Sequence, residues 1–290
     1  MPALHDASLT HAPRPVAWDA AAPLPASGRT VLMAPPAMPT TAAGVDLHRW
    51  GRRRLRFDTG RAAEQWAELR RTIEQLGVRV QMPAAVASAD QTAIADAAIV
   101  HNGTALLARF ANDARTPETD AVAPALAATG IEVITPPSGL VLEGGQVVLS
   151  ELTLFGGWFE HREQLGLTWA ARQLAVRLVA LRLAADGLDR LDLCLASLRP
   201  EIALCVPQAF EPAEFKTLRQ SISMLLAVPL DEAARGACSV VVLGRDVLVP
   251  AGCDRTAELL DTTGFRTHPV DVSEFASIGC GLAGLVLRAA

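Results

Sequence analysis

The stretch Ala97-Ala-Ile-Val-His-Asn-Gly-Thr-Ala-Leu-Leu-Ala-Arg109 contains two apolar runs on either side of Asn102-Gly103. An Asn-Gly pair between apolar runs is a strong short-range signal for the tight turn of a β-hairpin. We therefore expect residues 97–100 and 105–109 to pair as antiparallel strands.

The residues after this hairpin predict a helix and one more strand. Thr116 suits an N-cap and Pro117 suits a first helical position, so a helix is expected over residues 117–128. Gly130 ends it, and residues 131–134 have the composition of a short strand. Two strands, a helix and a strand thus form one structural unit.

This unit recurs about five times, at a spacing of roughly 50 residues, which is typical of repeat architectures. The short strands and the hairpins favour a closed ring of α/β units, in which the last strand returns to the first. An open α/β sheet is the alternative. The other expected helices are residues 61–76, 166–185, 212–226 and 254–262, and the other expected strands are residues 31–36, 78–80, 146–149, 152–155, 191–195, 202–206, 239–243, 247–249, 265–270 and 282–287.

Composition excludes several classes of protein. The chain has 290 residues, half of them apolar, and a net charge of −5 without a basic block, so nucleic acid is not an expected partner. No apolar run approaches the roughly 20 residues that a membrane span needs. The Pro- and Ala-rich residues 1–28 lack the apolar core of a signal peptide and are interpreted as a mobile leader before a single domain, residues 29–290.

The cysteines and glycines predict no metal and no cofactor. Five cysteines are an odd number without metal-ligand spacing, and no glycine-rich loop suggests a phosphate site. In a chain without a signal peptide, these thiols are most simply the reduced cysteines of a cytoplasmic protein.

Eight short segments have the order and spacing of a known family over about 260 residues. They are Leu32-Met-Ala-Pro-Pro36, Ala63-Glu-Gln-Trp66, Ile94-Ala-Asp-Ala97, Arg115-Thr-Pro-Glu-Thr119, Leu142-Glu-Gly-Gly145, Leu191-Asp192, Cys238-Ser239 and Ser273-Glu-Phe275. Through them the chain resembles the pentein superfamily of guanidino-group-modifying enzymes, dimethylarginine dimethylaminohydrolase foremost, with arginine deiminases and amidinotransferases close by. The resemblance implies a five-bladed α/β propeller, a pseudo-fivefold ring of ββαβ units, with a central acidic cleft for a guanidinium.

The same resemblance implies a set of chemical groups. The family attacks the guanidinium carbon with a cysteine, uses a histidine as general acid and base, and binds the cationic head with carboxylates. On this pattern Glu143 falls on the catalytic carboxylate and Asp96 on a substrate carboxylate. Arg190, however, stands at the histidine position, Gly284 at the cysteine position, and Gln146 at that of the aspartate after Gly-Gly.

Further residues are expected to contact a ligand. Arg109 lies where the family has an arginine at a strand end, and His161 and Arg162 follow a strand in the segment that lines the family's cleft. Arg190 can act in two ways. Its guanidinium can pair with Glu143 or Asp96 and fill the place of the substrate's guanidinium, or it can create a site for an anionic ligand.

Three functional hypotheses follow. The first is a degenerate, non-catalytic member that binds a small guanidino or amino-acid-like molecule or a partner subunit. The second is an active hydrolase of a guanidino or amidino C–N bond with a displaced nucleophile, Cys280, four residues before Gly284. The third is the inactive partner of a catalytic paralogue. A homodimer and such a pairing are both left open, and neither nucleic acid nor a membrane is expected as a partner.

Overall fold

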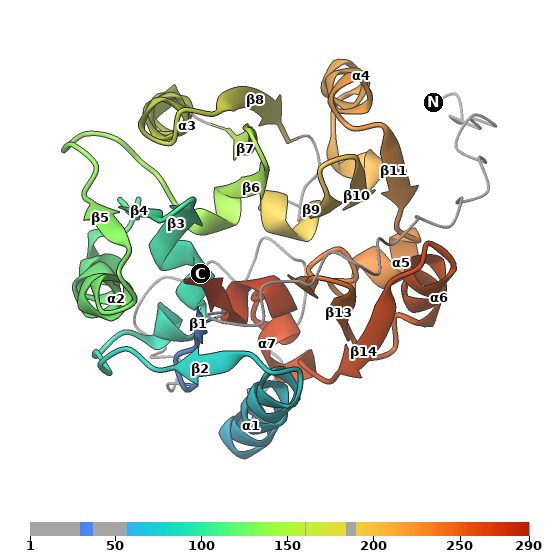
Figure 1. Cartoon of the computed structure of the whole chain (residues 1–290), viewed down its shortest axis with the longest axis horizontal. Helices are drawn as coiled ribbons and strands as arrows, with labels where there is room; N and C mark the ends of the chain where they lie inside the picture. Colours follow the sequence, from blue (N-terminus) through green and yellow to red (C-terminus); the bar gives the residue numbers. More distant parts are fainter. Residues whose placement is uncertain (1–29, 37–56, 160, 184–189, 290) are drawn as a thin grey trace.

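The computed structural model describes residues 30–36, 57–159, 161–183 and 190–289. The strands form five three-stranded sheets, which are β15 (Leu287–Arg288) with β1 (Thr30–Leu32) and β2 (Arg79–Gln81); β3 (Ala98–His101) with β4 (Thr104–Leu107) and β5 (Glu132–Ile134); β6 (Val147–Ser150) with β7 (Thr153–Trp158) and β8 (Arg177–Arg182); β9 (Leu195–Arg199) with β10 (Ile202–Cys205) and β11 (Met224–Ala227); and β12 (Val241–Leu243) with β13 (Asp246–Pro250) and β14 (Arg266–Val270). Figure 1 shows these sheets around a common centre.

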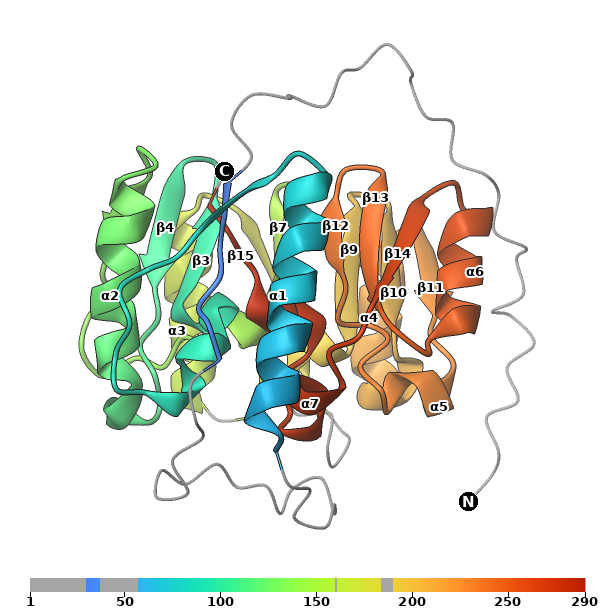
Figure 2. The same cartoon turned by 90° about the horizontal axis from the view of Figure 1, so that it is seen from below.

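Helices cover the outside of the sheets in Figure 1, and Figure 2 shows the strands running along one axis. The α-helices are α1 (Thr59–Gln75), α2 (Thr116–Ala127), α3 (His161–Gln173), α4 (Pro212–Ser221), α5 (Leu230–Ala233), α6 (Asp254–Thr262) and α7 (Ser273–Ser277). The 3₁₀ helices are η3 (Ala89–Thr92), η4 (Ile94–Ala97), η5 (Asp113–Arg115), η6 (Gly144–Gln146), η7 (Leu191–Leu193), η8 (Pro207–Ala209) and η9 (Leu282–Leu285). None of the helices in the described ranges combines the length and the apolar character that crossing a bilayer requires.

Each sheet repeats one internal order. In the second sheet β3 pairs antiparallel with β4, and β4 pairs parallel with β5 because α2 provides the crossover. The hairpin turns at Asn102 (φ 46°) and Gly103 (φ 78°), the left-handed conformations that a tight hairpin turn uses. The hairpin predicted from Asn-Gly is confirmed.

The two ends of the described chain meet in one sheet. β1 pairs antiparallel with β15, with Val31 opposite Arg288, and parallel with β2, with Val31 opposite Val80. This sheet therefore has the same order as the other four, although its first strand is the last one in the chain.

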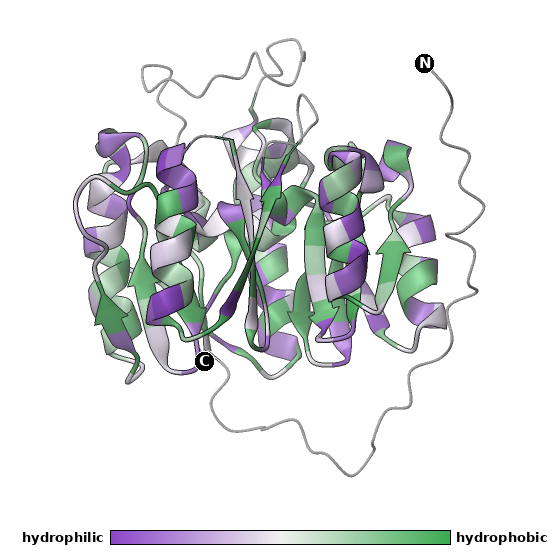
Figure 3. Cartoon of the chain, turned by 90° about the horizontal axis from the view of Figure 1, so that it is seen from above, coloured by the Kyte–Doolittle hydropathy of each residue, from purple (hydrophilic) through white to green (hydrophobic). Residues whose placement is uncertain are grey.

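The helices bury one face against the sheets and expose the other. The face of α1 formed by Ala62, Trp66, Leu69 and Ile73 is buried, as the three- and four-residue spacing predicts. In Figure 3 the strands are predominantly hydrophobic, whereas the helices carry hydrophilic residues on part of their surface.

The long helix predicted over residues 166–185 is wrong. The helix α3 ends at Gln173, Ala175 reverses the chain at φ 52°, and β8 follows. In β8 the buried residues are Val179 and Leu181, a period of two that belongs to a strand. The apolar residues of Arg177-Leu-Val-Ala-Leu-Arg182 fit the period of a helix as well as that of a strand, so the sequence alone favoured the helix.

Other boundaries differ as well. The strand expected over residues 31–36 is β1, which ends at Leu32, before Pro35 and Pro36. Residues 191–193 form η7 instead of a strand, and residues 282–285 form η9 before the short β15. The helix predicted to residue 226 ends at Ser221, because the apolar residues that follow pair with β10 as the strand β11. Thr116 is the first residue of α2 and not its N-cap, because η5 leads directly into that helix. The leader predicted over residues 1–28 lies outside the described residues.

Candidate functional site

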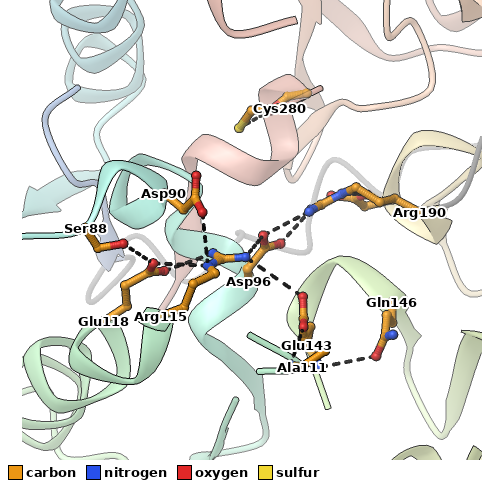
Figure 4. Close-up of polar contacts among 12 residues, drawn as sticks. Ser88, Asp90, Asp96, Ala111, Arg115, Glu118, Glu143, Gln146, Arg190 and Cys280 are labelled. Atoms are coloured by element: carbon orange, nitrogen blue, oxygen red, sulfur yellow. Dashed lines mark hydrogen bonds and ion pairs between the residues drawn. The ribbon is translucent and has the colours of Figure 1, made fainter. Parts of the chain in front are cut away.

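Residues far apart in the sequence meet because they occupy one position of the repeated unit. The 3₁₀ helices η4, η6, η7 and η9 stand directly before the first hairpin strands β3, β6 and β9 and before β15. These turns contact one another: η4 with η6 and η9, and η6 with η7. Asp96 lies in η4, Glu143 precedes η6, and Arg190 precedes η7, so all three reach the same region (Figure 4).

Arg190 is held by two carboxylates. Its Nη1 and Nη2 donate to Asp96 Oδ2 and Oδ1 at 2.9 and 2.6 Å, and its Nε and Nη2 donate to Asp192 Oδ1 and Oδ2 at 3.0 and 2.8 Å. Both contacts are bidentate, which is the strongest geometry between a guanidinium and a carboxylate. Of the two predicted arrangements of Arg190, the pairing of its guanidinium with Asp96 is therefore present.

A second arginine extends this ion-pair network. Arg115 donates from Nη1 to Asp96 Oδ2 at 3.2 Å and binds Glu118 through Nε and Nη2 at 3.0 and 2.9 Å. Its guanidinium carbon lies 4.1 Å from the centre of the Phe110 ring. Arg115, Glu118 and Asp192 lie in segments that match the family, but the sequence pattern predicted no role for them at the site. The i,i+3 spacing of Arg115 and Glu118 was the available signal for this pair.

Glu143 lies beside the network with weaker contacts. Its Oε1 accepts from the amide of Ala111 at 3.0 Å, and its Oε2 lies 3.9 Å from Arg115 Nη1. Gln146 completes a capping box with Glu143 and donates its own amide to Glu163 Oε1 at 2.9 Å. Burial, followed by the negative charge of Asp96, raises the pKa of Glu143.

Asp96 has the opposite pKa shift. It is 1% exposed, and burial by itself would raise its pKa. The positive charges of Arg190 and Arg115, together with their hydrogen bonds, outweigh that cost and lower the pKa of Asp96 to about 2. Asp96 is therefore an ionised carboxylate at neutral pH.

The network keeps a negative excess. Five carboxylates and two guanidiniums lie within 4.0 Å of a partner in it; they are Asp90, Asp96, Glu118, Glu143 and Asp192 with Arg115 and Arg190. A cavity of about 170 Å³ adjoins it, lined by Asp192, Gly144, Ala95 and Ala283 and by residues of β3, β6, β9, β12 and β15. Within the described ranges, no three His, Cys, Asp or Glu side chains are grouped to hold a metal ion.

Three predicted ligand residues lie outside this network. Arg109 forms a bridge with Leu142, and its Nη2 donates to the carbonyl of Pro136 at 2.7 Å. His161 and Arg162 are exposed in the first turn of α3. Among the described contacts, none joins these three residues to Asp96, Glu143 or Arg190. Their ligand roles remain predictions.

Known proteins share both sequence and architecture with this chain. No family model matches it. Over 234 residues it is 26% identical to the bifunctional arginine dihydrolase/ornithine cyclodeaminase ArgZ of Synechocystis. The aligned region covers 79% of this chain and 33% of ArgZ. Over 222 residues it is 28% identical to an uncharacterized protein of Aeropyrum pernix, which covers 74% of this chain and 77% of that protein. The chain thus spans about a third of the length of its bifunctional relative.

Two solved structures decide the fold. The N-terminal domain of ArgZ, a cysteine-to-serine variant bound to substrate, superposes with a TM-score of 0.81 at 23% identity, over 90% of this chain and 98% of that one. The dimethylarginine dimethylaminohydrolase of Pseudomonas aeruginosa, complexed with citrulline, superposes with a TM-score of 0.75 at 19% identity. This superposition covers 90% of this chain and 99% of that one. The chain has the pentein fold. The expected α/β class is confirmed, and five sheets of three strands fit the expected number of repeated units.

The sulfur of Cys280 lies close to Gly284, the residue that the resemblance puts at the family's cysteine position. A Cβ atom built on Gly284 would lie 3.0 Å from Cys280 Sγ, because the turn of η9 folds the segment back. Cys280 is 8% exposed, and burial raises the pKa of its thiol to about 12 despite the charge of Arg190. At neutral pH this sulfur is a thiol, the poorly nucleophilic form.

This protonation state predicts that the thiols of the folded protein react slowly. All five cysteines are free and buried, so we expect fewer than about one thiol per chain to react within minutes with a disulfide reagent at pH 8. All five should react once the protein is unfolded in denaturant. A rapidly reacting thiol that is lost in Cys280→Ala would contradict a neutral Cys280.

Proposed function

We propose that the protein is a non-catalytic relative of the arginine-modifying penteins. In this proposal residues 29–290 form a single domain in which the five sheets are the blades of a pseudo-fivefold propeller. The central site binds a small amino-acid-like or guanidino molecule or a partner subunit, and it breaks no C–N bond. The similarity to the bifunctional ArgZ and to a dimethylarginine dimethylaminohydrolase supports a ligand of this chemical class.

One observation carries the proposal. Arg190, at the family's histidine position, is bound to Asp96 and Asp192 by four hydrogen bonds. A general acid and base must exchange a proton near neutral pH, whereas a guanidinium stays protonated. Burial opposes the charge of Arg190, but Asp192 and Asp96 raise its pKa well above the usual value. The group at this position therefore cannot relay protons.

A second candidate function rests on a separate observation. Because Cys280 Sγ lies next to the nucleophile position at Gly284, a hydrolase with a displaced cysteine is the alternative. The raised pKa of this thiol argues against it. Five free cysteines also support a cytoplasmic location, which is part of the proposal.

The test is an activity assay on the full chain. Arginine, methylarginines and agmatine are supplied, and citrulline, dimethylamine and ammonia are measured, with the Pseudomonas aeruginosa dimethylarginine dimethylaminohydrolase as positive control. We expect no product above the enzyme-free rate. Turnover that disappears in Glu143→Gln would overturn the proposal, and turnover that also disappears in Cys280→Ala would establish the displaced-cysteine alternative.

A further inference from the structure

We infer that Arg190 is an intramolecular ligand: its guanidinium occupies a preformed guanidinium receptor made by Asp96, Asp192 and Gly145, and keeps free guanidino compounds out. The inference rests on the proposed function, since a catalytic site would need this receptor open. It narrows the ligand of the proposed function to an amino-acid-like molecule or a partner subunit, because Arg190 already occupies the guanidinium receptor of the unmodified chain.

The receptor matches a guanidinium in shape and charge. The planar fork of Arg190 presents one edge to Asp96 and another to Asp192, so all four donated hydrogen bonds end on carboxylate oxygens. An ammonium is a compact point charge and cannot satisfy two carboxylates side-on in this way. The receptor should therefore prefer guanidinium over ammonium.

Gly145 forms the floor of the receptor. A Cβ atom on this residue would overlap Nη2 and Cζ of Arg190 and would lie 2.8 Å from Asp96 Oδ1. The guanidinium thus lies against a bare Cα, in space that only glycine leaves open.

The receptor does not depend on Arg190 for its position. Asp96 is fixed by Arg115, and Arg115 is fixed by Glu118 and Phe110. Asp192 belongs to η7, whose backbone turn does not involve the Arg190 side chain. Removal of that side chain should leave two placed carboxylates around an empty guanidinium-sized space.

The Arg190 side chain contacts solvent over part of its length. The Arg190 side chain is 25% exposed, whereas that of Asp96 is 1% exposed. A free cation can consequently enter along the path of the arginine side chain and meet a carboxylate that water barely contacts. The tether holds the guanidinium at a high effective concentration, so free compounds cannot displace it from the unmodified chain.

The experiment is chemical rescue of Arg190→Ala. We expect its melting temperature to fall by about 10 °C, because two buried carboxylates lose their shared cation in a chain of this size. Methylguanidinium should bind with one site and a dissociation constant on the order of 1 mM, since so few atoms make the contact. At ten times that constant it should raise the melting temperature by about 3 °C. Methylammonium at equal ionic strength should not.

Matched controls separate rescue from a general salt effect. The unmodified chain should show no methylguanidinium binding. Arg71→Ala removes a guanidinium whose side chain is 63% exposed and whose partner Glu68 is 54% exposed, so it should show no rescue. If Arg190→Ala does not fold alone, Arg190→Gln keeps part of the packing and serves the same titration.

The outcomes distinguish the two proposals. A folded Arg190→Ala or Arg190→Gln that does not bind methylguanidinium, or an unmodified chain that binds it equally well, overturns the intramolecular ligand while the activity assay stands. Turnover by the unmodified chain overturns the proposed function, whatever the rescue gives.

Discussion

Asp96→Asn should lower the free energy of unfolding by about 3–5 kcal/mol, the usual cost of breaking a buried ion pair from one side. Asp96 accepts from Arg190 twice and from Arg115 once, so asparagine removes the charge from three buried contacts and turns an amide NH₂ group toward a guanidinium. The free energy of unfolding of a typical domain is about 5–15 kcal/mol, so this loss is a large fraction of the total stability. Urea denaturation followed by circular dichroism measures it.

The matched control is Asp246→Asn. Asp246 pairs with Arg266, whose side chain is 63% exposed, and with His268 on the strand β14. An ion pair with an arginine as exposed as Arg266 contributes up to about 1 kcal/mol, so the stability of the control should stay close to that of the unmodified chain. Equal losses in the two variants would refute the central role of Asp96.

The effect of Asp96→Asn should also depend on pH. The pKa of Asp96 falls from 3.8 to about 2 on folding, so its ionisation stabilises the native state above pH 3.8, by about 2 kcal/mol at neutral pH. This contribution is lost as the pH falls from about 4 to 2. The difference between the unmodified chain and Asp96→Asn should therefore narrow over that range, and a constant difference would contradict the assignment.

Gly144→Ala should cost on the order of 3 kcal/mol or more, because overpacking here meets backbone atoms. A methyl group at this position would overlap the carbonyl oxygen of Ala95 and lie 3.2 Å from that of Ala98. Neither carbonyl can move without displacing η4, which carries Asp96. The midpoint of urea denaturation gives the loss.

Gly60→Ala is the corresponding control. Gly60 lies in the first turn of α1, and a methyl group there would approach only Asp58 Oδ1, at 3.3 Å. Alanine is the better helix former by about 1 kcal/mol, so this variant should lie within that amount of the unmodified chain. If Gly144→Ala were equally stable, the close approach of the two backbones would be disproved.

The fold was predictable where the spacing of the apolar residues fitted only one kind of secondary structure. Asn102-Gly103 defined a hairpin, and the spacing of Trp66, Leu69 and Ile73 defined α1. The strand β8 was missed because its leucines and alanines fit both a helix and a strand. Only pairing with β7 decides between them, and pairing is a long-range property.

The site was predictable through its separate residues but not through their contacts. Asp96 and Arg190 were both assigned to the site, yet they are 94 residues apart, and no local spacing predicts their hydrogen bonds. Asp192 was missed because its role depends on the orientation of Arg190, two residues away. Glu118 needed only the helical i,i+3 relation to Arg115.

The pairing of β1 with β15 has a consequence for protein synthesis. Residues 30–32 leave the ribosome long before residues 287–288, because synthesis adds about 5–20 residues per second. Until translation reaches β15, β1 has β2 on one side and an unpaired edge on the other. A nascent chain can thus assemble four sheets in turn, whereas the fifth is completed only when the last strand has emerged.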